Sequence, residues 1–60
     1  HLTERIQRIR PTAKATITQH GECRVTEEGH VCYLPLNLFD ALSDDDTATI
    51  LEAMLVGLRK

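Results

Sequence analysis

The first residues of the chain carry an apolar pattern with helical spacing. Leu2, Ile6 and Ile9 recur at intervals of four and three residues, which places them on one side of a helix, and Pro11 ends the pattern. A short amphipathic helix is therefore predicted over residues 2–10, within a helical arm that spans residues 1–10. Because an isolated helix of this length is marginal in water, its apolar side must dock on other residues, in the same chain or in a partner.

Residues 13–34 alternate apolar and polar positions with a period of two, which is typical of strands that have one buried face. A three-residue turn that ends at Gly21 and a second turn at Glu28 and Gly29 bring the apolar positions of three strands to one face. The second turn holds either two or four residues. The segment is predicted to be an antiparallel meander, with facing pairs Ile17–Cys23, Ala15–Val25, Val25–Cys32 and Cys23–Leu34.

The last part of the chain is predicted to be helical. Asn37 caps a short helix over residues 38–42. Ser43 caps a longer helix over residues 44–58, whose first turn carries three aspartates where the helix dipole favours negative charge. The apolar residues of this helix form one broad side that faces the core, namely Ala48, Ile50, Leu51, Met54, Leu55 and Leu58.

These elements predict one small α+β domain over residues 1–60, in which the C-terminal helices pack on one face of the sheet. Its parts are the arm (1–10), the meander (13–34) and the helical part (37–58). A chain this short buries about 60% of the surface that its unfolded form exposes, so its core alone gives little stability. Because two cysteines cannot build a disulfide-rich scaffold, the expected support is one disulfide, a metal ion or a partner chain.

The composition narrows the class of protein only a little. Apolar residues at 42% and charged residues at 27% are ordinary for a globular chain. The longest apolar run extends from Ala53 to Val56, far short of the roughly 20 residues that span a bilayer. No leader-like apolar segment lies near the start. We therefore expect a cytoplasmic protein with no membrane partner.

Two cysteines and two histidines around the predicted turns are the candidate metal-ligating residues, because these side chains suit a tetrahedral zinc ion. Their spacing departs from the close cysteine pairs of zinc knuckles. A disulfide is also disfavoured, because the predicted register sets Cys23 opposite Leu34 rather than opposite the other cysteine. We favour two small apolar core thiols and no cofactor, with a small zinc-binding protein as an alternative. The candidate ligands are His20, Cys23, His30 and Cys32.

No group of residues in the sequence favours catalysis. The chain has no phosphate-binding glycine loop and no nucleophile elbow. Both thiols point into the predicted core, where a reactive thiolate is disfavoured. The run of aspartates at 44–46 lacks the alternating ligands and the glycine of a calcium-binding loop. An enzyme is therefore not predicted.

Positive charge is concentrated near the start of the chain, although the whole chain has a net charge of −2. Such a basic segment can contact nucleic-acid phosphates, and a β-ribbon can enter a DNA groove. A DNA-binding transcriptional regulator is therefore an alternative function, although dedicated nucleic-acid-binding domains usually have a strong basic excess. The candidate phosphate-contacting residues are Arg5, Arg8, Arg10, Lys14 and Arg24.

The small core and the surplus of amphipathic surface together predict a non-enzymatic protein-interaction or regulatory module. We expect a homodimer, or an adaptor that docks on a larger protein, through a helix in a groove or a strand added to a sheet edge. The exposed third strand is one candidate surface. The candidate partner-binding side chains lie on the two amphipathic helices, namely Leu2, Ile6, Ile9, Ala53 and Val56.

Overall fold

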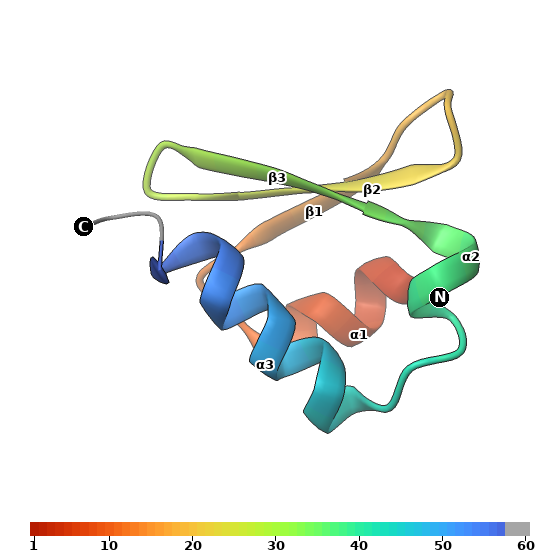
Figure 1. Ribbon diagram of the computed structural model, residues 1–60. Helices are drawn as coiled ribbons and strands as arrows, with labels where there is room; N and C mark the ends of the chain where they lie inside the picture. The colour runs from red at the N-terminus through yellow and green to blue at the C-terminus, as the bar shows by residue number, and fades with distance from the viewer. Residues whose placement is uncertain (58–60) are drawn as a thin grey trace.

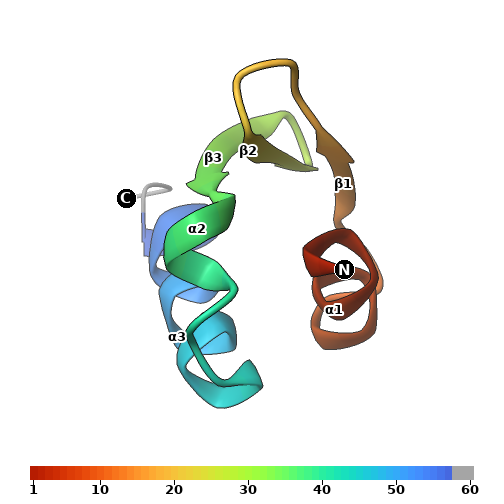
Figure 2. The same ribbon diagram turned by 90° about the vertical axis from the view of Figure 1, so that its right-hand side faces the viewer.

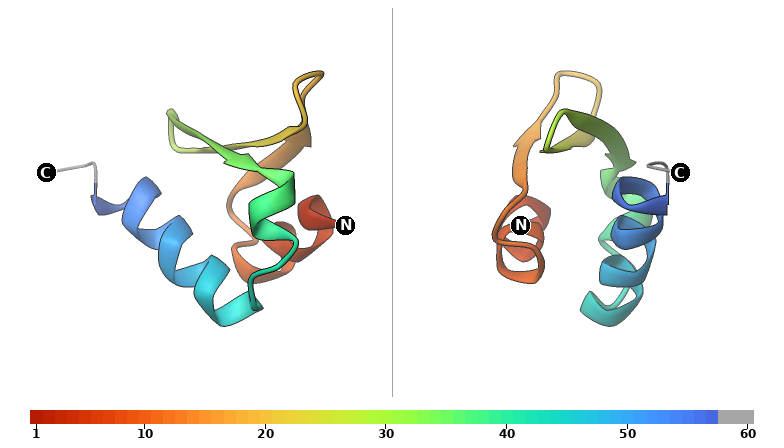
Figure 3. Two further views of the ribbon diagram at one scale, coloured as in Figure 1. Left: turned by 45° about the vertical axis from the view of Figure 1, so that its right-hand side comes forward. Right: turned by 90° about the vertical axis from the view of Figure 1, so that its left-hand side faces the viewer.

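The computed structural model describes residues 1–57 as a three-stranded antiparallel sheet with helices on one of its faces (Figure 1). In the views of Figures 2 and 3, α1 lies below β1 and α3 lies below β3, on the same side of the sheet. The predicted α+β fold is confirmed. The elements in chain order are α1 (Leu2–Ile9), β1 (Lys14–Ile17), β2 (Glu22–Glu27), β3 (His30–Pro35), α2 (Leu36–Phe39) and α3 (Asp44–Leu55).

The strands pair in the predicted register. The second turn takes the two-residue form, because Glu27 and His30 face each other on either side of it. Its two residues, Glu28 and Gly29, have φ angles of +49° and +83°, and positive φ at both positions matches the right-handed twist of the flanking strands. The confirmed facing pairs are Ile17–Cys23, Ala15–Val25, Val25–Cys32 and Cys23–Leu34.

The hydrophobic core lies between the inner face of the sheet and the helices. Leu2 and Ile6 of α1 are 2% and 0% exposed and belong to this core. The apolar side of the N-terminal helix therefore docks on its own chain. The other buried apolar residues are Ala13, Cys23, Val25, Cys32, Leu34, Phe39, Leu51 and Leu55.

The short helix α2 differs from its prediction. It begins at Leu36, directly after Pro35, and it has no side-chain cap from Asn37. Proline fixes φ, and Pro35, with φ −59° and ψ 127°, is the N-cap at which the chain leaves the strand and enters the helix. The Leu36 N–H donates instead to the Gly21 carbonyl at 3.2 Å. Burial of Phe39 then attaches the helix to the core.

The long helix α3 begins as predicted. Its N-cap is Ser43, whose Oγ accepts a hydrogen bond from the Asp46 N–H at 3.1 Å. The helix ends at Leu55, earlier than predicted, and Gly57, a poor helix former, follows two residues later. Leu58, which the predicted helix included, lies outside the described residues.

Within residues 1–57, none of the helices is both long and apolar enough to cross a membrane.

Candidate interaction surface

The outer face of the sheet, which the helices do not cover, carries the polar side of each strand. The register sets Arg24 between Thr16 on β1 and Tyr33 on β3. Two large apolar side chains also point to this face, and both belong to β3: Val31 is 41% exposed and Tyr33 is 49% exposed. The outer face is therefore polar on β1 and β2 and partly apolar along β3.

β3 is also an edge strand, because the strand order is β1-β2-β3. In an antiparallel ladder, the backbone groups of successive residues point to opposite sides. The pair that flanks a two-residue turn, here Glu27 and His30, is a hydrogen-bonded pair. The alternation therefore directs the backbone groups of Val31 and Tyr33 away from β2. No turn, loop or side-chain hydrogen bond within residues 1–57 reaches these groups. The edge of β3 is thus uncovered in the described part of the chain.

The composition of β3 leaves this edge unprotected. Proteins commonly keep exposed edges from pairing by means of short strands, charged side chains or proline. β3 has six residues, none of them Asp, Glu, Lys or Arg, and its proline stands only at the last position. The opposite edge, β1, has four residues and includes Lys14. The predicted third-strand surface is therefore the better edge for adding a strand. Its side chains, Val31 and Tyr33, could have been singled out by their outward alternation and the lack of charge.

A second exposed surface lies on the outer side of α3. Ala53 and Val56, both predicted to bind a partner, are exposed there. They line a shallow open depression of about 410 Å³ together with Thr49, Glu52 and Gly57. The structure therefore brings these two predicted residues together.

The predicted partner-binding residues of α1 lie elsewhere. Leu2 and Ile6 are enclosed in the core, and Ile9 is half-buried. The expectation that Leu2 and Ile6 meet a partner is therefore corrected, because their contacts are within the chain. Only Ala53 and Val56 of the predicted set form an exposed surface.

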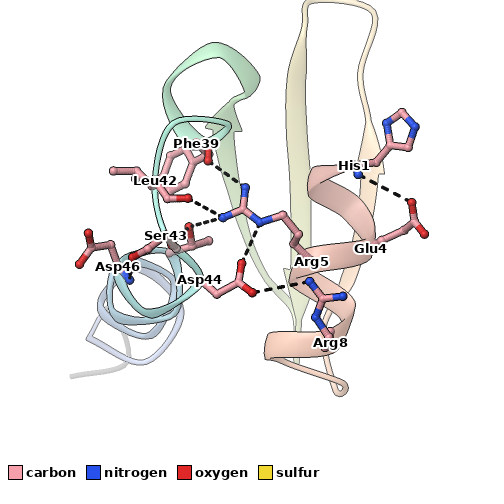
Figure 4. Close-up of polar contacts among 10 residues, drawn as sticks. His1, Glu4, Arg5, Arg8, Phe39, Leu42, Ser43, Asp44 and Asp46 are labelled. Carbon is pink, nitrogen blue, oxygen red and sulfur yellow. Dashed lines mark hydrogen bonds and ion pairs between the residues drawn. The ribbon is translucent and has the colours of Figure 1, made fainter.

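Arg5, predicted to contact phosphate, is instead bound within the fold (Figure 4). Its Nη2 donates to the Leu42 carbonyl at 2.7 Å, and its Nη1 donates to the Phe39 carbonyl at 3.1 Å. Its Nε donates to Asp44 Oδ1 at 2.8 Å. This hydrogen bond, together with the positive charges of Arg5 and Arg8, lowers the pKa of Asp44 below its usual value. Arg5 therefore ties α1 to the loop that precedes α3.

Arg10 is also bound within the fold, at the C-terminal end of β2. Its Nε lies 2.6 Å from Oε1 of Glu27, whose side chain is only 4% exposed. Thr12 Oγ1 donates to Oε2 of the same carboxylate at 3.1 Å, and the hydrogen bond to Glu27 raises the pKa of Arg10. This buried pair was not predicted from the sequence, although Glu27 continues the inward alternation of Cys23 and Val25.

The remaining predicted cations do not form one surface. Arg8 is on α1, below the sheet, and its Nη2 lies 3.6 Å from Asp44 Oδ2. Lys14 and Arg24 are exposed on the outer face of the sheet. The nucleic-acid interface stays a prediction, and its five candidate residues are distributed over separate places.

The four candidate metal ligands are not assembled. His20 lies in the turn between β1 and β2, whereas His30 follows the turn at the other end of β2. No group of three or more His, Cys, Asp or Glu residues within residues 1–57 is placed to hold a metal ion. Cys23 and Cys32 are free, buried thiols, and burial raises the pKa of each. Neither thiol is thus predisposed to act as a thiolate nucleophile.

Comparison of the chain with protein-family models, with curated proteins and with solved structures finds no match. Arguments about function therefore rest on the residues and their geometry.

Proposed function

We propose that this protein is a non-enzymatic interaction module that binds another polypeptide as an added strand along the edge of β3. The observation that carries the proposal is the uncharged edge beside Val31 and Tyr33, which nothing within residues 1–57 pairs with. In this mode of recognition, main-chain hydrogen bonds supply affinity and alternate side chains supply specificity. β3 offers both, since the backbone and the side chains of these two residues are accessible.

The chemistry of the neighbouring side chains supports the same function. Tyrosine and arginine are enriched in protein interfaces, and Tyr33 faces Arg24 on the outer surface of the sheet. An added strand would cover exposed parts of Val31 and Tyr33 on the outer face, and this burial would add to the little apolar surface that a 60-residue chain buries by itself. The added strand would therefore supply stability that so short a chain lacks by itself.

A library of displayed peptides tests this function on the protein immobilised at low density, so that its own copies are kept apart. We expect selected peptides in which apolar residues alternate with polar ones, and we expect their binding to shift the amide NMR signals of Val31 and Tyr33. Tyr33→Lys should abolish binding, because it places a charge on the docking edge. Ile17→Lys is the matched control, since Ile17 is an exposed apolar residue, 52% exposed, on the opposite edge strand.

Binding that persists in Tyr33→Lys would overturn the proposed function. So would selected peptides that shift only the signals of the α3 depression, because they would assign the interaction to Ala53 and Val56. Far-UV circular dichroism of both lysine variants shows whether each keeps its fold. Val31→Lys provides a second substitution on the same edge if Tyr33→Lys does not fold.

A further inference from the structure

We infer, on the basis of the proposed function, that the strand added to β3 is an isolated extended segment of another protein, with large apolar side chains on its inner face and basic residues at its ends. These apolar side chains pack on α3, below the edge of β3. Three features of the molecule support this partner: the apolar flank of α3, the space below the added strand and the charge of this half of the chain.

One flank of α3 is apolar and lies on the side of the β3 edge. α1 lies below β1 and α3 lies below β3 (Figure 2), so the flank of α3 that faces away from α1 is the one below this edge. Glu52 is on the other flank: the pKa of Arg10, the C-cap of α1, is raised by its hydrogen bond to Glu27 and also by the charge of Glu52. Helical residues two positions apart are separated by about 200° around the axis. Ile50 and Met54 therefore lie on the flank away from α1, where both are half-buried against the core.

The flank formed by Ile50 and Met54 extends the apolar inner surface beyond β3. Side chains alternate between the two faces of a strand, so every second side chain of an added strand points to the inner side, beside Cys32 and toward α3. The remaining side chains lie on the outer face, beside Val31 and Tyr33. Large apolar side chains at the inner positions gain the most from burial against this flank.

The position of α3 limits what can carry the added strand. Neighbouring strands lie about 4.8 Å apart, whereas the axes of packed helices lie about 8–10 Å apart. A strand with its own helix directly below it would therefore overlap α3, and a second copy of β3 is such a strand (Figures 2 and 3). The six residues of β3 also offer much less contact than the roughly 20–30 residues per side of a stable protein–protein interface. A short extended segment without a helix layer fits this space.

The half of the chain that contains β3 is acidic. Residues 22–60 contain eight acidic and three basic residues, whereas residues 1–21 contain one acidic and four basic residues. Within residues 1–57, the exposed side chains of Asp40, Asp45 and Asp46 form no ion pair. A surface with an excess of one charge favours encounter with a partner of the opposite charge. Lysine or arginine at the ends of the segment, outside the paired strand, is therefore complementary to this half.

Methyl NMR with a synthetic peptide tests the contact with α3. The peptide has three leucines that alternate with threonines, and two lysines at each end. Met54 is the only methionine of the chain, so its methyl signal is unambiguous. We expect the peptide to shift this signal together with the amide signals of Val31 and Tyr33, and to leave the methyl signals of Val56, on the outer side of α3, unchanged. Shifts at Val31 and Tyr33 without a shift at Met54 would overturn the inference.

A double-mutant cycle separates a direct contact from an effect on the fold. Met54→Ala should weaken binding of the leucine peptide about three- to tenfold in isothermal titration calorimetry, and should weaken much less the binding of a peptide with alanines in place of the leucines. Val56→Ala is the matched control on the outer side of α3 and should leave both affinities unchanged. Equal losses for the two peptides would show that Met54 acts only through the fold and would overturn the contact. Ile50→Val is the second substitution on this flank if Met54→Ala does not fold.

A peptide with glutamates in place of the terminal lysines tests the charge of the partner. The lysine peptide should bind on the order of tenfold more tightly at low ionic strength, and the difference should shrink as salt is added. Equal affinities, or a preference for the glutamate peptide, would overturn the inference of a basic partner.

The inferred partner and the proposed function fail in different ways. Peptides that bind at Val31 and Tyr33 without the shift at Met54, or without the preference for lysine, overturn the inferred partner and leave the proposed function in place. The same holds if the wild type forms a dimer in sedimentation equilibrium that Tyr33→Lys abolishes, because the added strand would then come from a second copy. If no peptide and no second copy binds at β3, both fail.

Discussion

Arg5 and Arg10 both attach the N-terminal arm to the rest of the molecule, but they do so in different surroundings. The guanidinium of Arg5 binds two backbone carbonyls and the half-exposed carboxylate of Asp44. The guanidinium of Arg10 binds Glu27, whose side chain is only 4% exposed. Without Arg5, the carboxylate of Asp44 stays half-exposed, and the other acceptors that lose a donor are neutral. Without Arg10, the buried carboxylate of Glu27 loses the guanidinium that lies 2.6 Å away, where water is scarce. The free energy lost therefore depends on the partner left behind.

The contacts of Arg5 and Arg10 also explain why positive charge is concentrated near the start of the chain. Three arginines near the start of the chain suggested an arm for nucleic acid, yet two of them bind groups of their own fold. Arg8 is more exposed but also faces Asp44. The basic excess of the arm is therefore largely used to bind carbonyls and carboxylates of the same chain. A cluster of arginines indicates nucleic-acid binding only where those side chains are accessible.

The largest effect is expected from Arg10→Met. Removing one member of a buried ion pair typically costs about 3–5 kcal/mol, because the other charge stays buried. A domain of this size has a free energy of unfolding of roughly 3–9 kcal/mol at about 0.05–0.15 kcal/mol per residue. We expect this variant to lose about 3 kcal/mol, a third or more of that stability, and not the upper end of the range, since Arg10 is itself partly exposed. Urea unfolding followed by circular dichroism measures the loss.

The double variant Arg10→Met with Glu27→Leu is the control for this prediction. Replacing both charges by apolar side chains of similar size is often neutral, so the double variant should recover most of the lost stability. A single variant as stable as the wild type would show that the Glu27 carboxylate does not depend on Arg10, and it would remove the distinction between the contacts of Arg5 and those of Arg10.

A smaller loss is expected from Arg5→Ala. Hydrogen bonds that involve a charged group contribute about 1.5–3 kcal/mol, and Arg5 donates to two carbonyls and one carboxylate. Because the one charged acceptor, Asp44, is half-exposed and no buried charge is left behind, we expect a cost of about 2 kcal/mol in urea unfolding. Arg5→Lys should recover only part of it, since an ammonium group cannot reproduce the planar fork of donors. Full recovery by lysine would mean that charge alone matters.

Much of the fold follows from local patterns in the sequence. The period-two alternation and the positions of Gly21 and Gly29 determine the register, because a shift of one residue would turn every apolar side chain outward. Ser43 followed by three aspartates determines the start of α3. These features depend on neighbours in the sequence, so a pattern can reveal them.

The contacts of Arg5 could not be predicted in the same way. Two of its acceptors are backbone carbonyls, of Phe39 and Leu42, and a carbonyl carries no residue-specific signal. The start of α2 also depended on a distant group, the Gly21 carbonyl that accepts from Leu36. Glu27 was different, because its inward position follows from alternation and a buried carboxylate requires a partner. The edge of β3 could be predicted only in part. The lack of charge on the strand was visible in the sequence, but its position at the edge of the sheet required the strand order.

Ser43→Ala tests whether the stabilisation by the contacts of Arg5 depends on the N-cap of α3. Ser43 lies between Leu42, whose carbonyl Arg5 binds, and Asp44. Replacing an N-cap serine by alanine typically costs about 1 kcal/mol, and thermal unfolding should show that loss. In the Arg5→Ala background the same substitution should cost less, because the two groups hold the same loop. If the losses of stability in the two single variants add up to the loss in the double variant, the N-cap of Ser43 and the contacts of Arg5 are independent.

The smallest effect concerns the ionisation of Asp44, the half-exposed carboxylate that Arg5 binds. Because the pKa of Asp44 is lowered in the folded chain, its contribution is fully present above the usual aspartate pKa of about 3.9. The contribution is lost as the pH falls through the lower folded pKa. The melting temperature of the wild type should therefore exceed that of Asp44→Asn at pH 7, and the difference should shrink below about pH 4 and in high salt.

Asp45→Asn is the matched control for this titration. Asp45 lies in the same first turn of α3 and near the same helix dipole, but it forms no ion pair within residues 1–57. Its substitution should change the melting temperature less than Asp44→Asn does, and with a weaker dependence on pH. Equal pH dependence in the two variants would assign the effect to the helix dipole and not to Arg5. The contacts of Arg5 that hold the loop would then be those to the carbonyls of Phe39 and Leu42 and to the Thr47 hydroxyl, all neutral groups, in contrast with the buried carboxylate of Glu27.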